Sequence, residues 1–282
     1  PITVTADPGQ SKVYGETDPV FTYTTDVALV GADSFSGSLT RDAGEHVASG
    51  PYNITQGTLD LGTDYNITYV GDTFAITAKP ITVTADPGQS KVYGETDPVL
   101  TYTTNVALVG ADSFTGSLTR DAGEHVASGP YNITQGTLDL GTDYNITYVG
   151  DTFAITAKPI TVTADPGQSK VYGETDPVFT YTTNVALVGG DSFTGSLTRD
   201  AGEHVASGPY NITQGTLDLG TDYNITYVGD TFAITAKPIT VTADPGQSKV
   251  YGETDPVLTY TTNVALVGAD SFTGSLTRDA GE

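Results

Sequence analysis

The chain has 282 residues, with no Cys, Met or Trp, and its 34 acidic and 11 basic residues give a formal net charge of −23. The lack of Cys excludes disulfide frameworks, thiolate metal sites and cysteine nucleophiles. The acidic surface repels nucleic acid phosphates and anionic headgroups, so we expect no nucleic-acid partner. No apolar run approaches the roughly 20 residues of a membrane span, so we expect no membrane insertion.

A fixed period organises the chain. The heptapeptide that begins at Pro1 returns at Pro80, Pro159 and Pro238, with a spacing of 79 residues. The sequence therefore predicts three complete repeats and an incomplete fourth, with the bounds 1–79, 80–158, 159–237 and 238–282. Because the chain begins at a repeat boundary and stops within a repeat, we expect it to be an excerpt of a longer protein. Copies of one module provide length or valency rather than a single catalytic site, so we predict that it is not an enzyme.

Apolar and polar residues alternate with period two along most of the first repeat, which predicts half-buried strands. The alternating stretches are 2–6, 21–24, 35–39, 52–54, 65–69 and 74–78. About seven strands in 79 residues predict an all-β fold, a small Ig-like β-sandwich in each repeat. A β-grasp-like module with a short helix is the alternative. Residues 28–33 could form a single helical turn.

Two connections are informative. Val70-Gly71-Asp72-Thr73 separates the last two strands and is interpreted as a hairpin turn. The run 74–83 passes from one repeat into the next without a Gly/Ser spacer, and Pro80 alone interrupts its strand pattern. So short a joint restricts bending, and we expect modules joined end to end into a stiff rod. Each repeat would add on the order of 35–45 Å.

The order of short segments along the repeat resembles a known family. The segments that carry the resemblance are Ile2 to Asp7, Lys12-Val13-Tyr14-Gly15, Asp18-Pro19, Thr22-Tyr23, Asp33 to Arg41, Tyr52-Asn53-Ile54, Gly57-Thr58-Leu59, Tyr65 to Thr68 and Phe74 to Thr77. Together they resemble the MBG repeat, a mostly β, glycine-rich module of large bacterial adhesins and haemagglutinin-like surface proteins. The stretch 46–52 is longer than the family's Asn-Val-Gly before the Tyr. The resemblance implies tandem extracellular β-domains at the bacterial cell surface, without catalytic residues.

Calcium is the cofactor to weigh, because the repeat is rich in carboxylates. Acids stand at 16–18, 60–64 and 71–72, but none of these matches an EF-hand loop or a Gly-Gly-x-Gly-x-Asp repeat. The joint between repeats carries Lys79 and no acid in sequence. Asp is common in turns, so we expect solvated turn residues, no metal site and no cofactor, with Ca²⁺ as the alternative.

Three further chemistries remain hypotheses. An internal cross-link could join Lys12 or Lys79 to Asn53 or Asn66, or Gln56 to a Thr, but we expect exposed Lys and Gln side chains. Asn53 and Asn66 each begin an Asn-Ile-Thr sequon for N-glycosylation, but the pattern Asn-x-Thr arises freely in Thr-rich strands. One His occurs in each complete repeat, at His46, His125 and His204, and a lone His lacks partners for metal or acid–base work. We therefore predict no catalytic, cofactor-binding or metal residue and no small-molecule substrate.

These observations lead to two main hypotheses about the function of the chain. The first is a structural stalk that projects a binding region of an extracellular adhesin away from the cell surface, with neighbouring repeats as its partners. The second is a self-assembling extracellular fibre or biofilm-matrix protein, in which other copies of the chain are the partners. Direct binding of each repeat to glycan or ice through outward Thr residues is a third hypothesis, although outward Thr is common on any exposed sheet.

Overall fold

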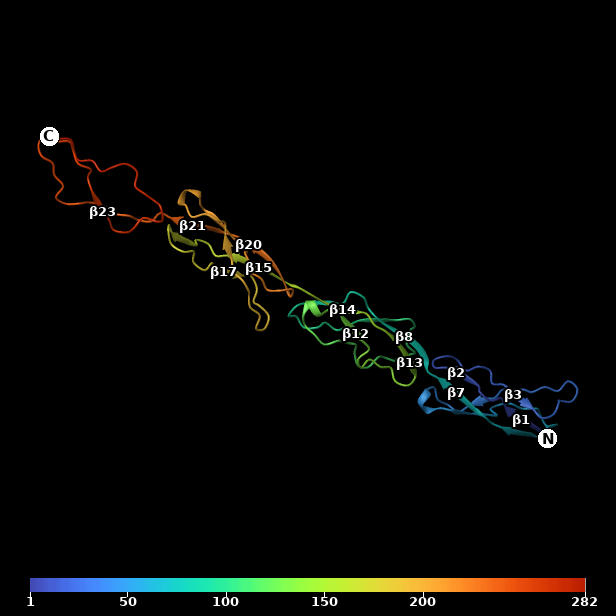
Figure 1. The fold of residues 1–282 in the computed structure, drawn as a ribbon. Coiled ribbons are helices and arrows are strands. Elements are labelled where there is room, and N and C mark those ends of the chain that lie inside the picture. The colour runs from blue at the N-terminus through green and yellow to red at the C-terminus, as the bar shows by residue number, and fades with distance from the viewer. Residues whose placement is uncertain (282) are drawn as a thin grey trace. The chain divides into compact units, whose positions relative to one another are not determined.

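The computed structural model describes residues 1–281, which form two compact units, one from Pro1 to Thr156 and one from Ala157 onward (Figure 1). Each unit is considered by itself below. The all-β prediction is confirmed, because the elements of these residues are strands and three 3-10 helices of three residues each. Within residues 1–281 no α-helix occurs, so the helix of the β-grasp alternative is absent.

The same seven strands recur in each complete repeat. Repeat 1 contains β1 (Ile2–Ala6), β2 (Ser11–Val13), β3 (Tyr23–Thr25), β4 (Thr40–Arg41), the 3-10 helix η1 (Val47–Ser49), β5 (Tyr52–Thr55), β6 (Ile67–Val70) and β7 (Thr73–Thr77). Repeat 2 contains β8 (Lys79–Ala85), β9 (Ser90–Val92), β10 (Tyr102–Thr104), β11 (Thr119–Arg120), η2 (Val126–Ser128), β12 (Tyr131–Thr134), β13 (Tyr144–Val149) and β14 (Thr152–Thr156).

The second unit repeats this order. It contains β15 (Lys158–Ala164), β16 (Ser169–Val171), β17 (Tyr181–Thr183), β18 (Thr198–Arg199), η3 (Val205–Ser207), β19 (Tyr210–Thr213), β20 (Tyr223–Val228) and β21 (Thr231–Thr235). Repeat 4 contributes β22 (Val241–Ala243) and β23 (Tyr260–Thr262), which pair with each other. Since the period of the sequence returns as a period of strands, the chain is a tandem array of small all-β repeats.

Each complete repeat holds two sheets. In repeat 1 their strand orders are β3-β1-β6 and β2-β7-β5-β4. Strand β1 runs parallel to β6, and β2 runs parallel to β7, whereas the other pairs are antiparallel. An immunoglobulin sandwich is built from antiparallel sheets. The two parallel pairs are therefore the distinctive feature of this repeat, since they join its first two strands to its last two.

The predicted hairpin at Val70-Gly71-Asp72-Thr73 is wrong. Strands β6 and β7 belong to different sheets, and Gly71 and Asp72 carry the chain from one sheet to the other. The Asp72 carbonyl accepts a hydrogen bond of 2.7 Å from the Ile54 amide. A Cβ on Gly71 would lie 2.8 Å from the Ile54 carbonyl oxygen, so the crossing passes close against β5 and requires glycine. Both strands alternate as predicted, but they are not partners.

Two other local predictions differ from the structure. The stretch 35–39 is not a strand; it holds one isolated bridge, between Ser36 and Asp60, and β4 begins only after it. Residues 28–33 form a turn closed by a 3.1 Å bond from the Asp33 amide to the Val30 carbonyl, without a helix. Strand β2 was not predicted, because Ser11-Lys12-Val13 carries a charged residue at its inward position.

The core lies between the two sheets of each repeat. The inward residues of β1 are Ile2, Val4 and Ala6, each at most 1% exposed, and they alternate with half-buried Thr residues. Strand β7 contributes Phe74, which is fully buried. Burying one such side chain stabilises the fold by about 1.5–3 kcal/mol. The alternation of the sequence therefore reports the inner face of each sheet correctly.

No helix in residues 1–281 has the length and apolar character that would let it cross a membrane.

Candidate functional site: the junction between repeats

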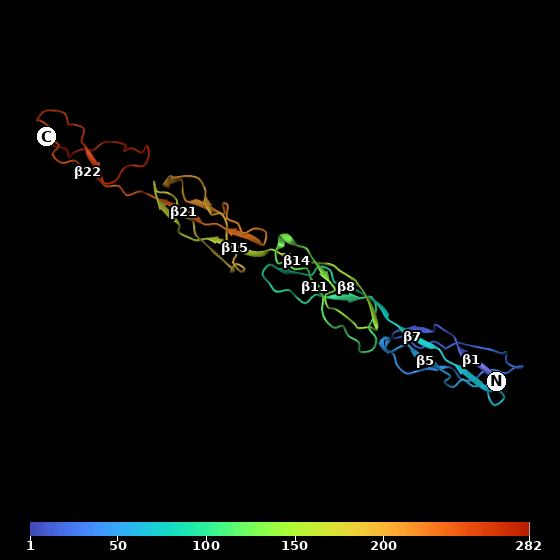
Figure 2. The ribbon, with the colours of Figure 1, turned by 60° about the horizontal axis from the view of Figure 1, so that its bottom comes forward.

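The joint between repeats 1 and 2 lies within the first unit, so its contacts can be described in full (Figures 1 and 2). Strand β7 ends at Thr77 and β8 begins at Lys79, so Ala78 alone separates the two repeats. The Lys79 amide donates 2.9 Å to the Asp143 carbonyl, and its ammonium donates 3.2 Å to the Ala107 carbonyl. Lys79, the first residue of β8, is therefore already hydrogen-bonded to repeat 2 through its backbone and its side chain.

Tyr14 forms the centre of this junction. It follows β2, where its amide donates 2.9 Å to the Thr77 carbonyl, and only 6% of it is exposed. Its hydroxyl donates 3.0 Å to Asp112 Oδ2 in repeat 2, and its ring meets the Tyr144 ring edge-on, with centroids 5.5 Å apart. Burial and the Asp112 carboxylate raise the pKa of Tyr14 to about 12, so the phenol stays protonated and donates at neutral pH.

The carboxylate of Asp112 and the ring of Tyr144 are themselves held in place. The Tyr144 hydroxyl donates 2.8 Å to Asp112 Oδ2 and accepts a 2.7 Å bond from the Val109 amide. Asp112 thus receives one phenol from each repeat. The apolar core of repeat 1 also continues into repeat 2 through Ile81 and Tyr144, both at most 6% exposed.

Gly15 has no room for a side chain. Its φ is +82°, where L-residues are strained, and a Cβ would lie 2.4 Å from Val109 Cγ2 of repeat 2. Carbon atoms in contact normally stay about 3.5–4.0 Å apart. Glycine at this position therefore permits both the turn after β2 and the close approach of the next repeat.

Asp143 makes a second set of contacts across the joint. Its Oδ1 accepts a 2.7 Å bond from the Val47 amide, and its Oδ2 lies 2.6 Å from His46 Nδ1. Asp143 raises the pKa of His46 by hydrogen bonding to the protonated ring. His46 thus has a carboxylate partner from the next repeat, which the sequence did not indicate, and its side chain is 65% exposed, in agreement with the predicted surface loop residue. The joint also contains the acids Asp112 and Asp143, contrary to the expectation from its local sequence.

The geometry recurs in the second unit, between repeats 3 and 4. Gly173 has a φ of +86°, and a Cβ there would lie 2.4 Å from Val267 Cγ2. The pKa of Tyr172 is raised, chiefly by its hydrogen bond to Asp270. These four residues correspond to Gly15, Val109, Tyr14 and Asp112. The same contact therefore forms at the joint inside each of the two units.

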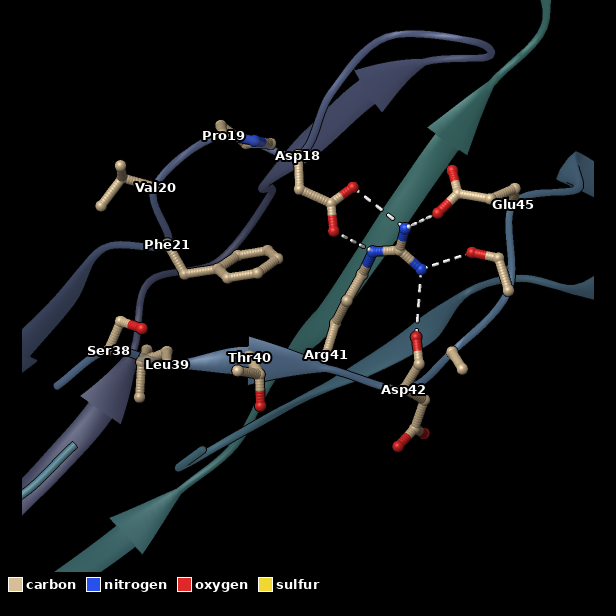
Figure 3. Close-up of a pocket in the computed structure, with 12 residues that line it drawn as sticks. Asp18, Pro19, Val20, Phe21, Ser38, Leu39, Thr40, Arg41, Asp42 and Glu45 are labelled. Atoms are coloured by element: carbon tan, nitrogen blue, oxygen red, sulfur yellow. Dashed lines mark hydrogen bonds and ion pairs between the residues drawn. The ribbon is translucent and has the colours of Figure 1, made fainter. Parts of the chain in front are cut away.

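Beside the junction, two buried cations, Lys12 and Arg41, bind two more exposed acids, Asp18 and Glu45, within repeat 1. Figure 3 shows Arg41 with the two acids. The Arg41 guanidinium uses all five of its N–H groups, on both oxygens of Asp18, on Glu45 Oε1 and on the carbonyls of Asp42 and Gly44. Arg41 holds the pKa of Asp18 below its usual range. The hollow above it, about 500 Å³, therefore presents no free N–H of Arg41 for an anion.

Lys12 completes the cluster. Its side chain is 4% exposed, and its ammonium contacts Asp18 Oδ1 at 2.7 Å as well as Glu45 Oε2. The expectation of an exposed Lys is therefore wrong for this residue. The two carboxylates are its ion-pair partners, rather than the asparagines considered for a cross-link. The same four-residue arrangement is present in repeats 2 and 3.

The remaining candidate residues take ordinary local roles. Asp60 Oδ2 accepts from the Gly62 amide at 3.0 Å, and Asp72 Oδ1 accepts from the Thr73 amide at 2.6 Å. Asn53 lies on β5 and donates 2.8 Å to Asp42 Oδ2. In the part of the chain that the structure describes, no group of three or more His, Cys, Asp or Glu is arranged to hold a metal ion.

Comparison with known families places these contacts in context. The MBG domain (YGX type) matches the chain four times, over residues 2–75, 81–154, 160–233 and 239–282. The chain belongs to the MBG family. No curated protein matches it.

The Tyr-Gly element in the description of the MBG domain corresponds to Tyr14-Gly15 here, and it recurs at Tyr93, Tyr172 and Tyr251. In this MBG chain the element contacts the following repeat at Tyr14-Gly15 in the first unit and at Tyr172-Gly173 in the second. The partner residues Val109, Asp112, Asp143 and Tyr144 were not predicted as a site. They lie on two loops and a strand start about one repeat further along the chain, and no local pattern links them to Tyr14.

Proposed function

We propose that the chain is a spacer within an extracellular bacterial adhesin and projects a binding region away from the cell surface. The observation that supports this proposal is the junction of repeats 1 and 2, where one residue separates consecutive strands and Tyr14, Gly15 and His46 contact the next repeat. A joint with so short a connection and so many contacts bends little, and a spacer whose joints bend little keeps a constant end-to-end length.

The polar chemistry of the repeat is consistent with a structural role. Lys12, Arg41, Asp18 and Glu45 bind one another, and Asp112 and Asp143 bind the neighbouring repeat. The partners we propose are therefore the neighbouring repeats, with no catalytic step, cofactor, small-molecule substrate, nucleic acid or membrane insertion. The net charge of −23 makes the like-charged repeats of one chain repel one another, which keeps the chain extended.

Negative-stain electron microscopy over a concentration series tests this proposal. We expect discrete rods whose length does not change with concentration. Fibres that lengthen with concentration and carry a regular axial repeat would overturn the spacer function and favour the self-assembling fibre or matrix protein. Flexible chains without a defined length would overturn both.

A further inference from the structure

We infer that each complete repeat is a tension clamp, in which parallel ladders hold its first two strands to its last two against force along the chain. The inference rests on the proposed function, because a spacer between an anchor and a bound head is pulled from both ends. It adds a mechanical function to the spacing function. Repeat 2 shows the arrangement in full.

Two parallel ladders connect the arms of repeat 2. Strand β8 pairs with β13 over six residue pairs, from Lys79 with Tyr144 to Thr84 with Val149. Strand β9 pairs with β14 over three residue pairs, from Ser90 with Ala154 to Val92 with Thr156. Bonds of 3.0 Å from the Ala154 amide to the Gln89 carbonyl and of 2.8 Å from the Tyr93 amide to the Thr156 carbonyl extend the second ladder at both ends.

The directions of these strands determine how force acts on them. Strand β8 receives the pull through Lys79 from repeat 1, and β14 receives it through its last residue, Thr156. Because the paired strands are parallel, the two ends of the repeat pull partners in opposite directions along their common axis. In Figure 1, β8 and β13 lie together near β7, and β14 lies further along the repeat. The ladders are therefore loaded in shear, with their hydrogen bonds strained together rather than one after another.

The strands that take the pull are interior strands. Strand β8 lies between β10 and β13, and β14 lies between β12 and β9. Neither can leave its sheet without breaking two ladders. Their inward side chains are closed off from water: Val83 and Phe153 are fully buried, and Ile81 is 1% exposed. Buried backbone groups have no water to replace a lost partner, so opening the ladder by shear is unfavourable at every bond.

The clamp recurs in the other complete repeats and not in the described part of repeat 4. Repeat 1 has the parallel pairs β1 with β6 and β2 with β7, and repeat 3 has β15 with β20 and β16 with β21. Within residues 238–281, β22 pairs antiparallel with β23 and has no parallel partner. Residues 1–281 therefore contain three clamps and one segment, 238–281, that serves as an internal control.

Single-molecule force spectroscopy on the full chain tests the inference. Handles fused to the two ends should give three unfolding events at similar high force, each releasing at most about 260–280 Å of chain for 79 residues. The segment 238–281 should extend at low force without a comparable event. Three events no stronger than the extension of that segment would overturn the clamp.

A second pulling direction on the same chain supplies the control. Because the chain has no Cys, handles can be attached at D86C and V149C, which lie at or just beyond the same ends of β8 and β13. Force between these points peels the strands apart and breaks their bonds in sequence. We expect a several-fold lower unfolding force than for end-to-end pulling of the same variant. Equal forces in the two directions would refute the clamp, whereas rods in the electron microscope would still support the spacer.

Discussion

Replacing Gly15 by Ala should loosen the junction of repeats 1 and 2 without unfolding either repeat. Two costs arise. An Ala at a φ of +82° costs about 1–2 kcal/mol in backbone strain. Its Cβ, 2.4 Å from Val109 Cγ2, adds an overpacking cost of about 1–3 kcal/mol.

The second cost can be relieved by separation of the repeats. The junction that opposes separation includes the edge-on pair of Tyr14 and Tyr144, worth about 0.5–1.5 kcal/mol, and the bond from the Val47 amide to Asp143, worth about 1.5–3 kcal/mol. The clash offsets a large part of these two contributions and should therefore shift the junction toward an open state. A middle value of about 2 kcal/mol corresponds to roughly a 30-fold shift toward the open state.

The assay is the distance distribution between spin labels at V20C and V99C, two equivalent sites at 86% and 87% exposure in repeats 1 and 2. The parent chain should give a narrow distribution and G15A a broad one. Two variants serve as matched controls. Gly9 and Gly252 have φ values of +77° and +84°, but a Cβ at either meets nothing within 4 Å. G9A and G252A carry the same strain and should leave the distribution narrow. A narrow distribution for G15A would refute the role assigned to this glycine.

Three other perturbations have defined outcomes. Asp143 raises the pKa of His46, so the His46 contribution to the junction is complete below about pH 6.5 and is lost as pH rises through the raised pKa. The label distribution should therefore broaden as pH rises above about 6.5, and D143N should remove this pH dependence. R41L removes the main partner of Asp18 and one of the two cations that bind Glu45, while Lys12 still contacts both carboxylates. Repeat 1 should therefore unfold in a separate earlier transition in denaturant, less stable by about 1.5–3 kcal/mol. Because the pKa of Asp18 is lowered, the stability difference from the parent should be present above about pH 4 and shrink as pH falls further. The described residues form no group of carboxylates that could hold a metal ion, so addition of a chelator should leave the thermal midpoint of unfolding unchanged. A fall of several degrees would reveal a calcium site and contradict this expectation.

Alternation of apolar and polar residues was enough to predict the strands that line the core. It located β1 at its observed bounds and placed β5, β6 and β7 within about two residues. The alternation could not show which strands pair with each other in a sheet. The short turn at Gly71-Asp72 fits a hairpin in sequence, but the alternation does not tell whether the next strand returns to the same sheet or crosses to the other.

The parts that sequence reasoning missed depend on distant residues. Lys12 has the sequence context of an exposed strand residue, and only the arrival of Asp18 and Glu45 makes its burial favourable. Tyr14 and Asp112 are 98 positions apart in the chain. A single repeat contains both halves of this contact on opposite faces, so its sequence alone could not indicate that the contact forms between repeats.

The most direct test of the spacer account is the dependence of molecular length on the number of repeats. Deleting residues 80–158 removes one repeat and joins Lys79 to Pro159, which restores the Lys-Pro sequence present at every other joint. Small-angle X-ray scattering would give the maximum dimension of the parent chain, of this deletion and of a second deletion of residues 80–237. The account predicts an equal decrease for each repeat removed, on the order of 35–45 Å. A maximum dimension that instead follows the square root of repeat number, as for flexibly linked domains, would contradict it.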